Sequence, residues 1–359
     1  MYKTLLVTRR WRGHEDKWMQ YMKEILGPLI NELDIREIEL QPTGSYQEQH
    51  YRKVTEFSGS PQVMLQELKD TEILIVGGAP EADDMIAADK NLKLIICPRG
   101  GPVNVDVEAA TKHGIPVVNS PGRNAESVVD HTFGLLLAEV RHIARSYHAL
   151  LQGNHDEGFK EWRQPLFELP EKTLGLVGFG KVGSLMAKRA KGFDMNVIVY
   201  DPYVSEKVVE KYGAKKVDLE TVMKESDFVS IHARLTPETR HLISYKEFKL
   251  MKKTAIFVNT SRGPVVDEAA LIETLKNKKI AGAALDVVEE EPIQKHPENP
   301  LYKLDNVTFT PHTAGQSDMI MDRGTKMACE DLARFLRNET MKNVLNRKGL
   351  NYPPYPSDE

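Results

Sequence analysis

The sequence predicts an α/β protein with two doubly wound parallel-sheet domains, and three observations lead to this fold class. Short apolar segments alternate with helical patterns along almost all of the 359 residues, which favours parallel strands covered by helices on both faces. The chain is long enough for two domains of ordinary size, each with its own core. A second set of strands begins at Thr173, just before a glycine-rich turn near the middle of the chain.

The first set of strands belongs to a small domain of its own, with expected strands at residues 5–7, 35–39, 73–76, 94–97 and 117–118. Apolar residues at helical spacing between Trp18 and Leu29 predict a helix after the first strand. Residues 41–60 are polar and lack periodicity, so we interpret them as an irregular insertion on the surface.

A long helix is expected over residues 124–151, where apolar residues from Val128 to Ile143 recur at helical spacing. A helix of this length cannot bury itself within one small domain. We therefore expect it to link the two domains and to bury apolar surface against another subunit.

The second set of strands is expected at residues 174–177, 197–200, 228–231, 255–258, 281–285 and 307–310. After Gly315 a helical pattern from Ile320 to Leu336 has no following strand. We expect this last helix to return and to pack on the first domain.

The glycine-rich turn, Gly178-Phe-Gly-Lys-Val-Gly183, has the features of a dinucleotide site: a buried-type strand precedes it, a helix follows it, and Asp201 closes the next strand. Gly178 permits the tight turn, Gly180 lets the backbone approach a pyrophosphate, and Gly183 allows the helix to pack closely. Asp201 can accept hydrogen bonds from ribose hydroxyls and would repel a 2′-phosphate. The second domain is therefore predicted to be a Rossmann domain that binds NAD rather than NADP.

Composition excludes several other classes of partner. The net charge is −4 and no basic stripe is present, so nucleic acid is not an expected partner. No apolar run approaches the ~20 residues of a membrane span. The N-terminus has no export signal, so a soluble, cytoplasmic protein is expected. Cys97 and Cys329 have no metal-type spacing, which predicts reduced, half-buried thiols and no metal site.

Three strand ends in the second half carry groups suited to a single reaction. The carboxyl ends of parallel strands line the ligand crevice, so Arg262 is expected beside a nicotinamide, although an arginine on a surface loop is the alternative. His312 can take or give the proton that hydride transfer at a 2-hydroxy acid requires. Glu291 is expected to hold its imidazole, but on chemistry alone Glu289 and Glu290 compete for this role.

Four segments, in this order, resemble the D-isomer-specific 2-hydroxyacid dehydrogenases, the family of phosphoglycerate, glycerate and D-lactate dehydrogenases. They are the turn at 178–183, Ser-Arg-Gly-Pro-Val-Val-Asp from Ser261, Ala-Leu-Asp-Val-x-Glu-x-Glu-Pro ending at Pro292, and Pro311-His-Thr-Ala-Gly. The resemblance covers residues 73–336. It implies reversible hydride transfer between NAD and C2 of a 2-hydroxy or 2-keto acid, a homodimer, and a catalytic set of Arg262, Glu291 and His312.

The resemblance also implies the domain split and the cofactor site. Residues 121–315 would form the NAD-binding Rossmann domain, and residues 1–120 with 316–359 a discontinuous, flavodoxin-like substrate domain. The residues expected to line the cofactor are Gly178, Gly180, Lys181, Val182, Gly183, Asp201, His232, Ala233, Thr236, Pro237, Thr260, Ser261, Asp286 and Gly315.

The expected substrate loop departs from the family's usual Gly-Val-Gly and reads Cys97-Pro-Arg-Gly-Gly-Pro-Val-Asn104. Gly100 and Gly101 can still donate backbone N–H bonds to a substrate carboxylate, whereas Pro102 has no N–H to donate. Arg99 replaces the first glycine, and we expect it either to contact a second polar or anionic group of the substrate or to fasten the loop to a neighbouring acid. The expected substrate-binding residues are thus Arg99, Gly100 and Gly101, with Arg262 and His312.

Two other functions share this scaffold. Formate or phosphite oxidation is one, but formate dehydrogenases place glutamine where this chain has Glu291. The other is an NADH-sensing transcriptional corepressor, which would bind the dinucleotide without turnover.

Overall fold

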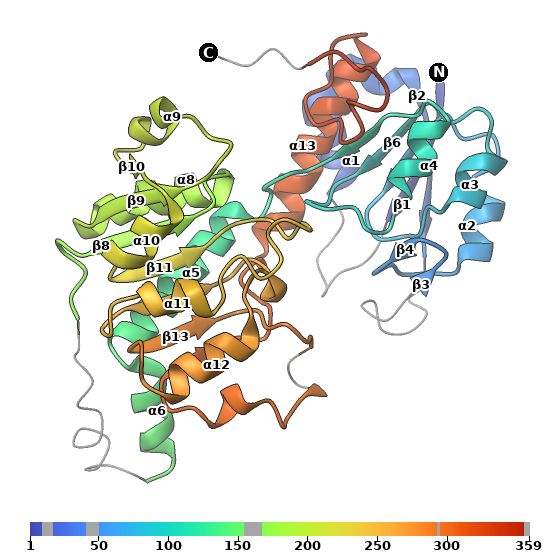
Figure 1. Ribbon diagram of the computed structural model, residues 1–359. Coiled ribbons are helices and arrows are strands. Elements are labelled where there is room, and N and C mark those ends of the chain that lie inside the picture. Colours follow the sequence, from blue (N-terminus) through green and yellow to red (C-terminus); the bar gives the residue numbers. More distant parts are fainter. Residues whose placement is uncertain (9–16, 41–49, 154–166, 293–294, 355–359) are drawn as a thin grey trace. The chain divides into compact units, whose positions relative to one another are not determined.

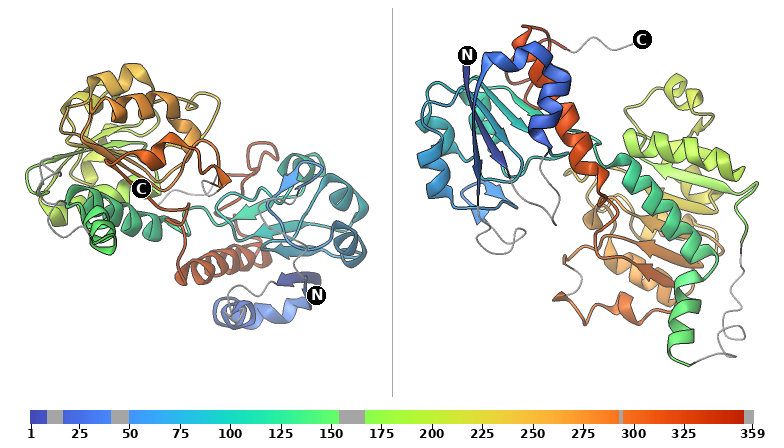
Figure 2. Two further views of the ribbon diagram at one scale, coloured as in Figure 1. Left: turned by 90° about the horizontal axis from the view of Figure 1, so that it is seen from below. Right: turned by 180° about the vertical axis from the view of Figure 1, so that it is seen from behind.

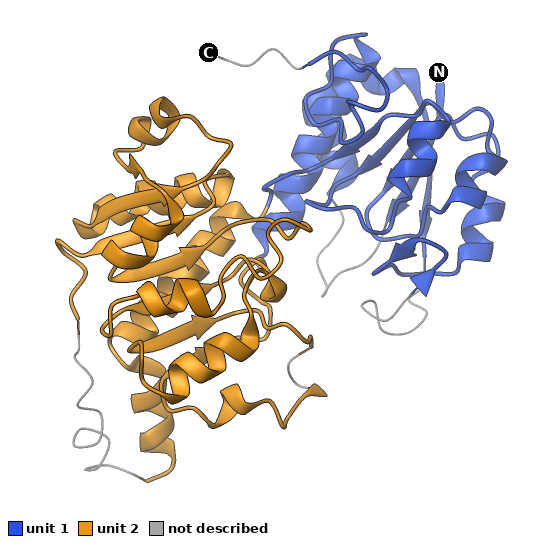
Figure 3. Cartoon of the chain, in the orientation of Figure 1, with its two compact units in different colours: residues 1–123, 318–359 blue, residues 124–317 orange. Residues whose placement is uncertain are grey.

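The computed structural model describes residues 1–8, 17–40, 50–153, 167–292 and 295–354. The chain forms two compact units, one made of residues 1–123 and 318–359 and the other of residues 124–317 (Figures 1 and 3). Each unit contains its own parallel sheet with helices on both faces. The predicted α/β class with two doubly wound parallel sheets is confirmed.

The parallel sheet of the first unit has the strand order β2-β1-β5-β6-β7, which is the flavodoxin-like order. The two central strands β5 and β6 are buried along their whole length, as expected for strands covered on both faces. The five strands are β1 (Tyr2–Thr8), β2 (Leu33–Glu39), β5 (Ile73–Val76), β6 (Leu94–Cys97) and β7 (Val117–Asn119).

Two groups of helices cover the faces of this sheet. Ile73 and Ile75 of β5 pack with α1 and α13, whereas Leu74 and Val76 pack with α2, α3 and α4. The helix after Gly315 therefore packs on the first unit, as predicted, and lies beside α1 (Figure 2). The helical segments of this unit are α1 (Trp18–Leu26), η1 (Gly27–Glu32), α2 (Pro61–Glu67), α3 (Asp83–Ala88), α4 (Val107–Lys112) and α13 (Met319–Leu336).

The prediction of an irregular insertion over residues 41–60 is wrong for part of that segment, and residues 41–49 lie outside the described residues. Strands β3 (His50–Tyr51) and β4 (Val54–Thr55) form an antiparallel hairpin. Its turn contains Arg52 and Lys53, and Arg52 has a φ of 51°. Such turns usually carry Asn or Gly at positive φ, so this one gave no turn signal in the sequence.

The sheet of the second unit has the strand order β10-β9-β8-β11-β12-β13-β14, the order of a Rossmann sheet with an added strand, and its order reverses between β8 and β11. Ligands of such sheets bind at the carboxyl ends of the strands near this reversal. The strands are β8 (Thr173–Val177), β9 (Asn196–Tyr200), β10 (Lys215–Lys216), β11 (Phe228–Ile231), β12 (Ile256–Asn259), β13 (Gly282–Leu285) and β14 (Val307–Phe309).

The helices of the second unit also form two layers. One core contains α5 (Ala125–Val140) and α8 against the sheet, and the other contains α10, α11 and α12. After α5 and α6 (Ile143–Leu151), the helical segments of this unit are α8 (Lys181–Ala190), η3 (Lys191–Phe193), α9 (Glu206–Lys211), α10 (Leu219–Glu225), α11 (Tyr245–Leu250), η4 (Gly263–Val265), α12 (Glu268–Lys276) and η6 (Pro300–Lys303). No helix within the described ranges has both the length and the apolar character that crossing a membrane would require.

The single long helix expected over residues 124–151 is two helices, α5 (Ala125–Val140) and α6 (Ile143–Leu151). They meet at His142, which is buried and has a left-handed φ of 54°. A non-glycine residue in this conformation leaves no mark in the sequence pattern, so the apolar periodicity ran across the break. Helix α5 packs on the second sheet, whereas α6 buries none of its residues.

Candidate active site

The glycine-rich turn after β8 is shaped by contacts that only glycine permits. Gly178 has a φ of 97°, and a Cβ there would lie 2.7 Å from the backbone nitrogen of Ala233. A Cβ at Gly183 would lie 2.3 Å from the carbonyl oxygen of Gly178, so α8 rests directly on the turn.

Gly180 differs, because a Cβ there would meet no protein atom within 4 Å, although the residue caps the N-terminus of α8. The protein's own packing therefore does not require glycine at this position. A glycine before the helix N-terminus suits the close approach of a pyrophosphate, so the turn fits a dinucleotide. Lys181 and Val182 begin the same helix.

Asp201 follows β9 and is fastened to this turn. Its Oδ2 accepts a hydrogen bond from the backbone N–H of Phe179 at 2.8 Å. Its Oδ1 accepts from the N–H groups of Tyr203 at 2.8 Å and Val204 at 3.3 Å. A carboxylate has about four acceptor positions, so these bonds leave capacity for a further donor such as a ribose hydroxyl.

The loops after β11 and β12 hold most of the other expected cofactor residues. Burial lowers the pKa of His232 to about 3, so its imidazole is neutral, and its Nε2 lies 2.9 Å from the hydroxyl of Ser230. Thr236 forms a small exposed turn with Thr239 ahead of α11, next to Pro237. The hydroxyls of Thr260 and of Thr132 in α5 are 2.8 Å apart.

Ser261 and Gly315 are also held by close neighbours. The N–H and hydroxyl of Ser261 both donate to Oδ1 of Asn259 at the end of β12. A Cβ at Gly315 would lie 2.8 Å from Nδ2 of Asn124. All the expected cofactor residues lie in the second unit, and the glycine turn meets the loop after β11 where Gly178 lies against His232 and Ala233.

His312 and Glu291 form a close pair after β14 and β13. Oε2 of Glu291 lies 2.6 Å from Nδ1 of His312, which must donate because an ionised carboxylate only accepts. This hydrogen bond is the main cause that raises the pKa of His312, while partial burial and the positive charge of Arg262 oppose it. The proton on Nδ1 leaves Nε2 as the ring atom able to exchange a proton with a ligand.

The three consecutive glutamates after β13 each lie next to a different histidine. Oε1 of Glu289 is 2.7 Å from Nε2 of His241, and Oε2 of Glu290 is 3.4 Å from Nδ1 of His296. Of the three carboxylates that competed on chemistry alone, it is Glu291 that lies beside His312. Chemistry and spacing alone left this choice open, and the position beside His312 is the one held by the glutamate that the family resemblance implies.

Arg262 lies in the loop that follows β12, next to a glycine that brings two loops together. A Cβ at Gly263 would lie 1.7 Å from the carbonyl oxygen of Val288, so the loop carrying Arg262 touches the loop carrying Glu291. The guanidinium is exposed and donates to the carbonyl oxygen of Ser261 at 2.7 Å. Gly263 was not singled out in the sequence, although a glycine directly after a functional arginine is a usable signal.

Asp286 anchors the loop that carries His312. It is 2% exposed; its Oδ1 accepts from the hydroxyl of Thr310 at 2.5 Å and the N–H of Thr313 at 2.8 Å, and its Oδ2 accepts from the N–H of Ala314 at 2.8 Å. Nε2 of His131, which the sequence gave no reason to select, lies 2.9 Å from the same threonine hydroxyl and must donate to it, because that hydroxyl gives its own proton to Asp286. His312 itself has a φ of 52°, so this loop holds a non-glycine residue in the left-handed region.

The expected substrate loop lies in the first unit. Arg99 donates to the carbonyl oxygen of Glu56 at 3.0 Å, to Oε2 of Glu56 at 2.9 Å and to Oδ1 of Asn104 at 3.0 Å. This is the fastening arrangement of the two that the sequence left open. Within the described part of the chain, the N–H groups of Gly100 and Gly101 donate to no backbone acceptor.

Comparison with known proteins identifies relatives over most of the chain. Residues 133–314 match the family model "D-isomer specific 2-hydroxyacid dehydrogenase, NAD binding domain". A D-3-phosphoglycerate dehydrogenase from Methanocaldococcus jannaschii is 42% identical over 292 residues, which are 80% of this chain and 54% of that protein. The chain thus spans about half the length of this relative. A glyoxylate reductase from Korarchaeum cryptofilum is 38% identical over 296 residues, 82% of this chain and 89% of that protein.

Solved structures agree with these relatives. The apo-structure of D-lactate dehydrogenase from Escherichia coli superposes with a TM-score of 0.67 at 28% identity, covering 96% of this chain and 99% of that one. D-mandelate dehydrogenase from Rhodotorula graminis gives a TM-score of 0.78 at 25% identity, covering 96% and 97%.

Proposed function

Because this chain belongs to the D-isomer-specific 2-hydroxyacid dehydrogenase family, we propose that it interconverts a 2-keto acid and the D-2-hydroxy acid, with His312 as the proton donor and acceptor. It is an oxidoreductase that acts on CH–OH groups, and its cofactor is NAD, which supplies or accepts the hydride when bound. The observation that carries the proposal is the 2.6 Å pair between His312 and Glu291.

The roles of the remaining residues follow from the same reaction. The C2 oxygen of the keto acid gains a proton as it is reduced, and Nε2 of His312 is the ring atom available to give it. The guanidinium of Arg262 would clamp the substrate carboxylate and polarise the C2 carbonyl, which its planar set of donors suits. We propose that the N–H groups of Gly100 and Gly101 also receive the carboxylate, so that the first unit is the substrate domain and the second the NAD-binding domain.

The substrate we propose is a short 2-keto acid such as glyoxylate. The guanidinium of Arg99 is committed to Glu56 and Asn104, which argues against its use on a distal phosphate or carboxylate of the substrate. Relatives named glyoxylate reductase support the same choice. Preference for NADH over NADPH remains a proposal based on the negative charge of Asp201.

Turnover is the direct test. NADH oxidation should be followed with short aliphatic, aromatic, dicarboxylic and phosphorylated 2-keto acids, using both NADH and NADPH. We expect the highest catalytic efficiency with NADH and a short keto acid. If the protein binds NADH but turns over none of these acids, the proposed dehydrogenase activity is wrong. The NADH-sensing corepressor would then be the better explanation, although no observation on the described residues favours it.

We also propose that the protein is a homodimer, and the exposed face of α6 supports this. Ile143, Tyr147, Leu150 and Leu151 are each more than half exposed on this one helix, at 56%, 65%, 54% and 66%. Apolar side chains gathered in this way commonly mark an interaction surface. Sedimentation of the wild type and of Tyr147→Lys tests the dimer, and a wild-type monomer would contradict it. Its cytoplasmic location stays a prediction from the sequence.

A further inference from the structure

Residues 50–58, which contain the hairpin β3–β4, contact the proposed substrate loop at several points. The two hydrogen bonds from Arg99 to Glu56 join the loop to the residue that directly follows β4. The N–H of Thr55 donates to the carbonyl oxygen of Val103 at 3.0 Å, two residues beyond the glycine pair. The N–H of Ser58 donates at 2.7 Å to the carbonyl oxygen of Gly78, just after β5. We call residues 50–58 the brace.

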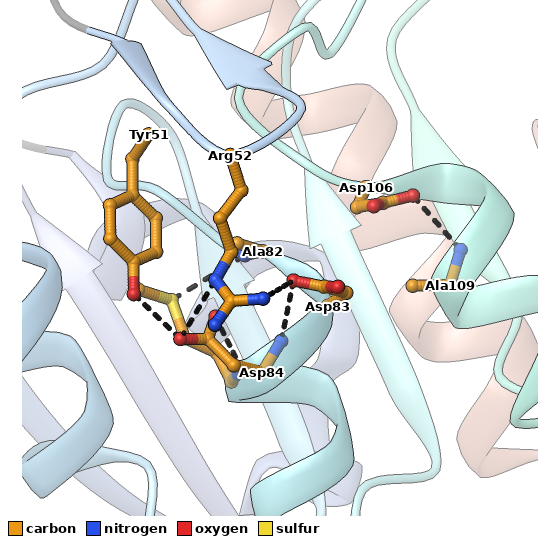
Figure 4. A network of polar contacts seen from close by, with 8 residues as sticks. Tyr51, Arg52, Ala82, Asp83, Asp84, Asp106 and Ala109 are labelled. Carbon is orange, nitrogen blue, oxygen red and sulfur yellow. Dashed lines mark hydrogen bonds and ion pairs between the residues drawn. The ribbon is translucent and has the colours of Figure 1, made fainter.

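The other end of the brace is held by the acidic first turn of α3, as Figure 4 shows. The hydroxyl of Tyr51 donates to Oδ2 of Asp84 at 2.6 Å. The guanidinium of Arg52 lies 3.0 Å from Oδ1 of Asp83 and 3.2 Å from Oδ2 of Asp84. Nearby, Lys53 pairs with Glu108 of α4 at 2.9 Å. The hairpin is thus bound both to two helices and to the loop.

Burial shows that the brace is part of the core of the first unit. Val54 and Phe57 are 0% and 1% exposed and pack with the residues of β5 and β6. The side chain of Arg99 is only 13% exposed, whereas that of Glu56 is 48% exposed. Arg99 also bonds Asn104, whose Nδ2 donates to the carbonyl oxygen of Ala79 at 2.7 Å. One guanidinium therefore connects the brace, the substrate loop and the segment after β5.

We infer that the brace is a positioning element for the substrate: through Glu56 and Arg99 it holds the N–H groups of Gly100 and Gly101 in the orientation that receives the 2-keto acid carboxylate. This inference rests on the function proposed above. Neither glycine N–H is used by a backbone acceptor in the described residues, so both are available to a ligand once the loop is held. Among the described residues the brace is joined by hydrogen bonds to Arg99 and Val103, on either side of the glycine pair, so it is expected to act on substrate binding and not on proton transfer.

Glu56→Gln and Arg99→Met are the variants that test the brace, alone and combined. Methionine keeps the aliphatic stem of Arg99 and removes its charge. KM for the keto acid should rise about tenfold in Glu56→Gln, because its ion pair with Arg99 is lost, and at least as much in Arg99→Met, which removes all three hydrogen bonds of the guanidinium. In both variants kcat and NADH affinity should stay near wild type. Short keto acids and those with a distal anion should lose binding alike. The double variant should be no worse than Arg99→Met, because the two residues act through each other.

The matched control is Glu67→Gln, which removes the carboxylate of another arginine–glutamate pair in the first unit, between α2 and Arg36 of β2. Its KM should equal that of the wild type. An unchanged KM in Glu56→Gln with an unchanged melting temperature would overturn the inference. So would a KM rise in Arg99→Met confined to substrates with a distal anion, because the arginine would then bind substrate directly.

A second readout separates this inference from the proposed function. Hydrogen exchange at the amides of Gly100 and Gly101 should accelerate in Glu56→Gln relative to the control, whatever the substrate is. Faster exchange in Glu56→Gln, together with a wild type that turns over no keto acid, would support the brace and contradict the proposed enzyme. Unchanged exchange would contradict the brace even if the enzyme is active. If Arg99→Met does not fold, Glu56→Gln alone decides, because its carboxylate is half exposed.

Discussion

Replacing Glu291 with glutamine separates the charge at this position from its shape. The variant keeps a side chain of the same size 2.6 Å from Nδ1 of His312 but removes the negative charge. Because the bond to Glu291 is the main cause that raises the pKa of His312, the variant lowers that pKa. The protonated imidazole, which would give its proton to the C2 oxygen as NADH supplies the hydride, then loses that proton at a lower pH than in the wild type.

The size of the effect follows from the exposure of the pair. A hydrogen bond to a charged group is worth about 1.5–3 kcal/mol. Solvent reaches both partners, with 44% of His312 and 32% of Glu291 exposed, so the lower end applies. At neutral to alkaline pH the reduction rate should therefore fall about tenfold, 1.36 kcal/mol corresponding to one factor of ten. At a pH where both imidazoles are protonated the rates should converge, and oxidation, which needs the neutral ring, should extend to lower pH.

The assay is kcat against pH in both directions with NADH or NAD saturating. Glu290→Gln is the matched control, since its carboxylate is 75% exposed and lies beside His296 instead. His312→Asn should lower kcat by about 100-fold or more at every pH while NADH still binds. A profile that Glu291→Gln leaves unmoved, or that Glu290→Gln moves equally, would refute the assigned roles.

Three further predictions concern packing, a buried acid and the cofactor. Gly263→Ala should lower kcat and should lower the free energy of unfolding by about 1–3 kcal/mol, because its Cβ would meet the backbone of Val288 at 1.7 Å. Gly192→Ala is the control, since a Cβ there meets open space and should change neither quantity. Equal effects of the two variants on kcat and melting temperature would contradict this. Burial raises the pKa of Glu81 well above its usual range, and among the described residues its carboxylate oxygens have no partner. The neutral carboxyl of Glu81 is compatible with the folded state at low pH, and the stability that it contributes is lost as the pH rises. Glu81→Met should therefore raise the melting temperature at alkaline pH, and a lower melting temperature there would contradict the prediction. Asp201→Ala should weaken the binding of NADH more than that of NADPH, measured as the ratio of the two catalytic efficiencies. A wild-type enzyme that favours NADPH would show that Asp201 does not bind the ribose as proposed.

Much of the fold could be predicted because continuous apolar runs mark strands buried on both faces. The strands at 73–76, 94–97 and 228–231 were predicted to the residue. The features that were missed depend on single backbone conformations. Arg52 and His142 adopt positive φ without glycine, so neither the hairpin nor the break between α5 and α6 has a sequence signal.

The site was predictable in its residue types and less so in its contacts. The family resemblance implied His312 and Glu291, whereas chemistry alone left three adjacent glutamates open, and in the folded loop it is Glu291 that lies beside His312. The direction of Arg99 was unreadable because its partner Glu56 lies 43 residues earlier, in the segment interpreted as irregular. A side chain's direction depends on what the fold brings beside it, and local pattern does not contain that information.

The way Asp286 holds the His312 loop has a consequence for how this enzyme can change over evolution. Two of the three groups it binds are backbone N–H groups, of Thr313 and Ala314, and any residue other than proline supplies one. The identities at 313 and 314 are thus free to vary as far as this anchorage is concerned, while Asp286 is not. A lineage could therefore change the half-buried side chain at position 313, next to His312, without loosening the hydrogen bonds by which Asp286 holds this loop.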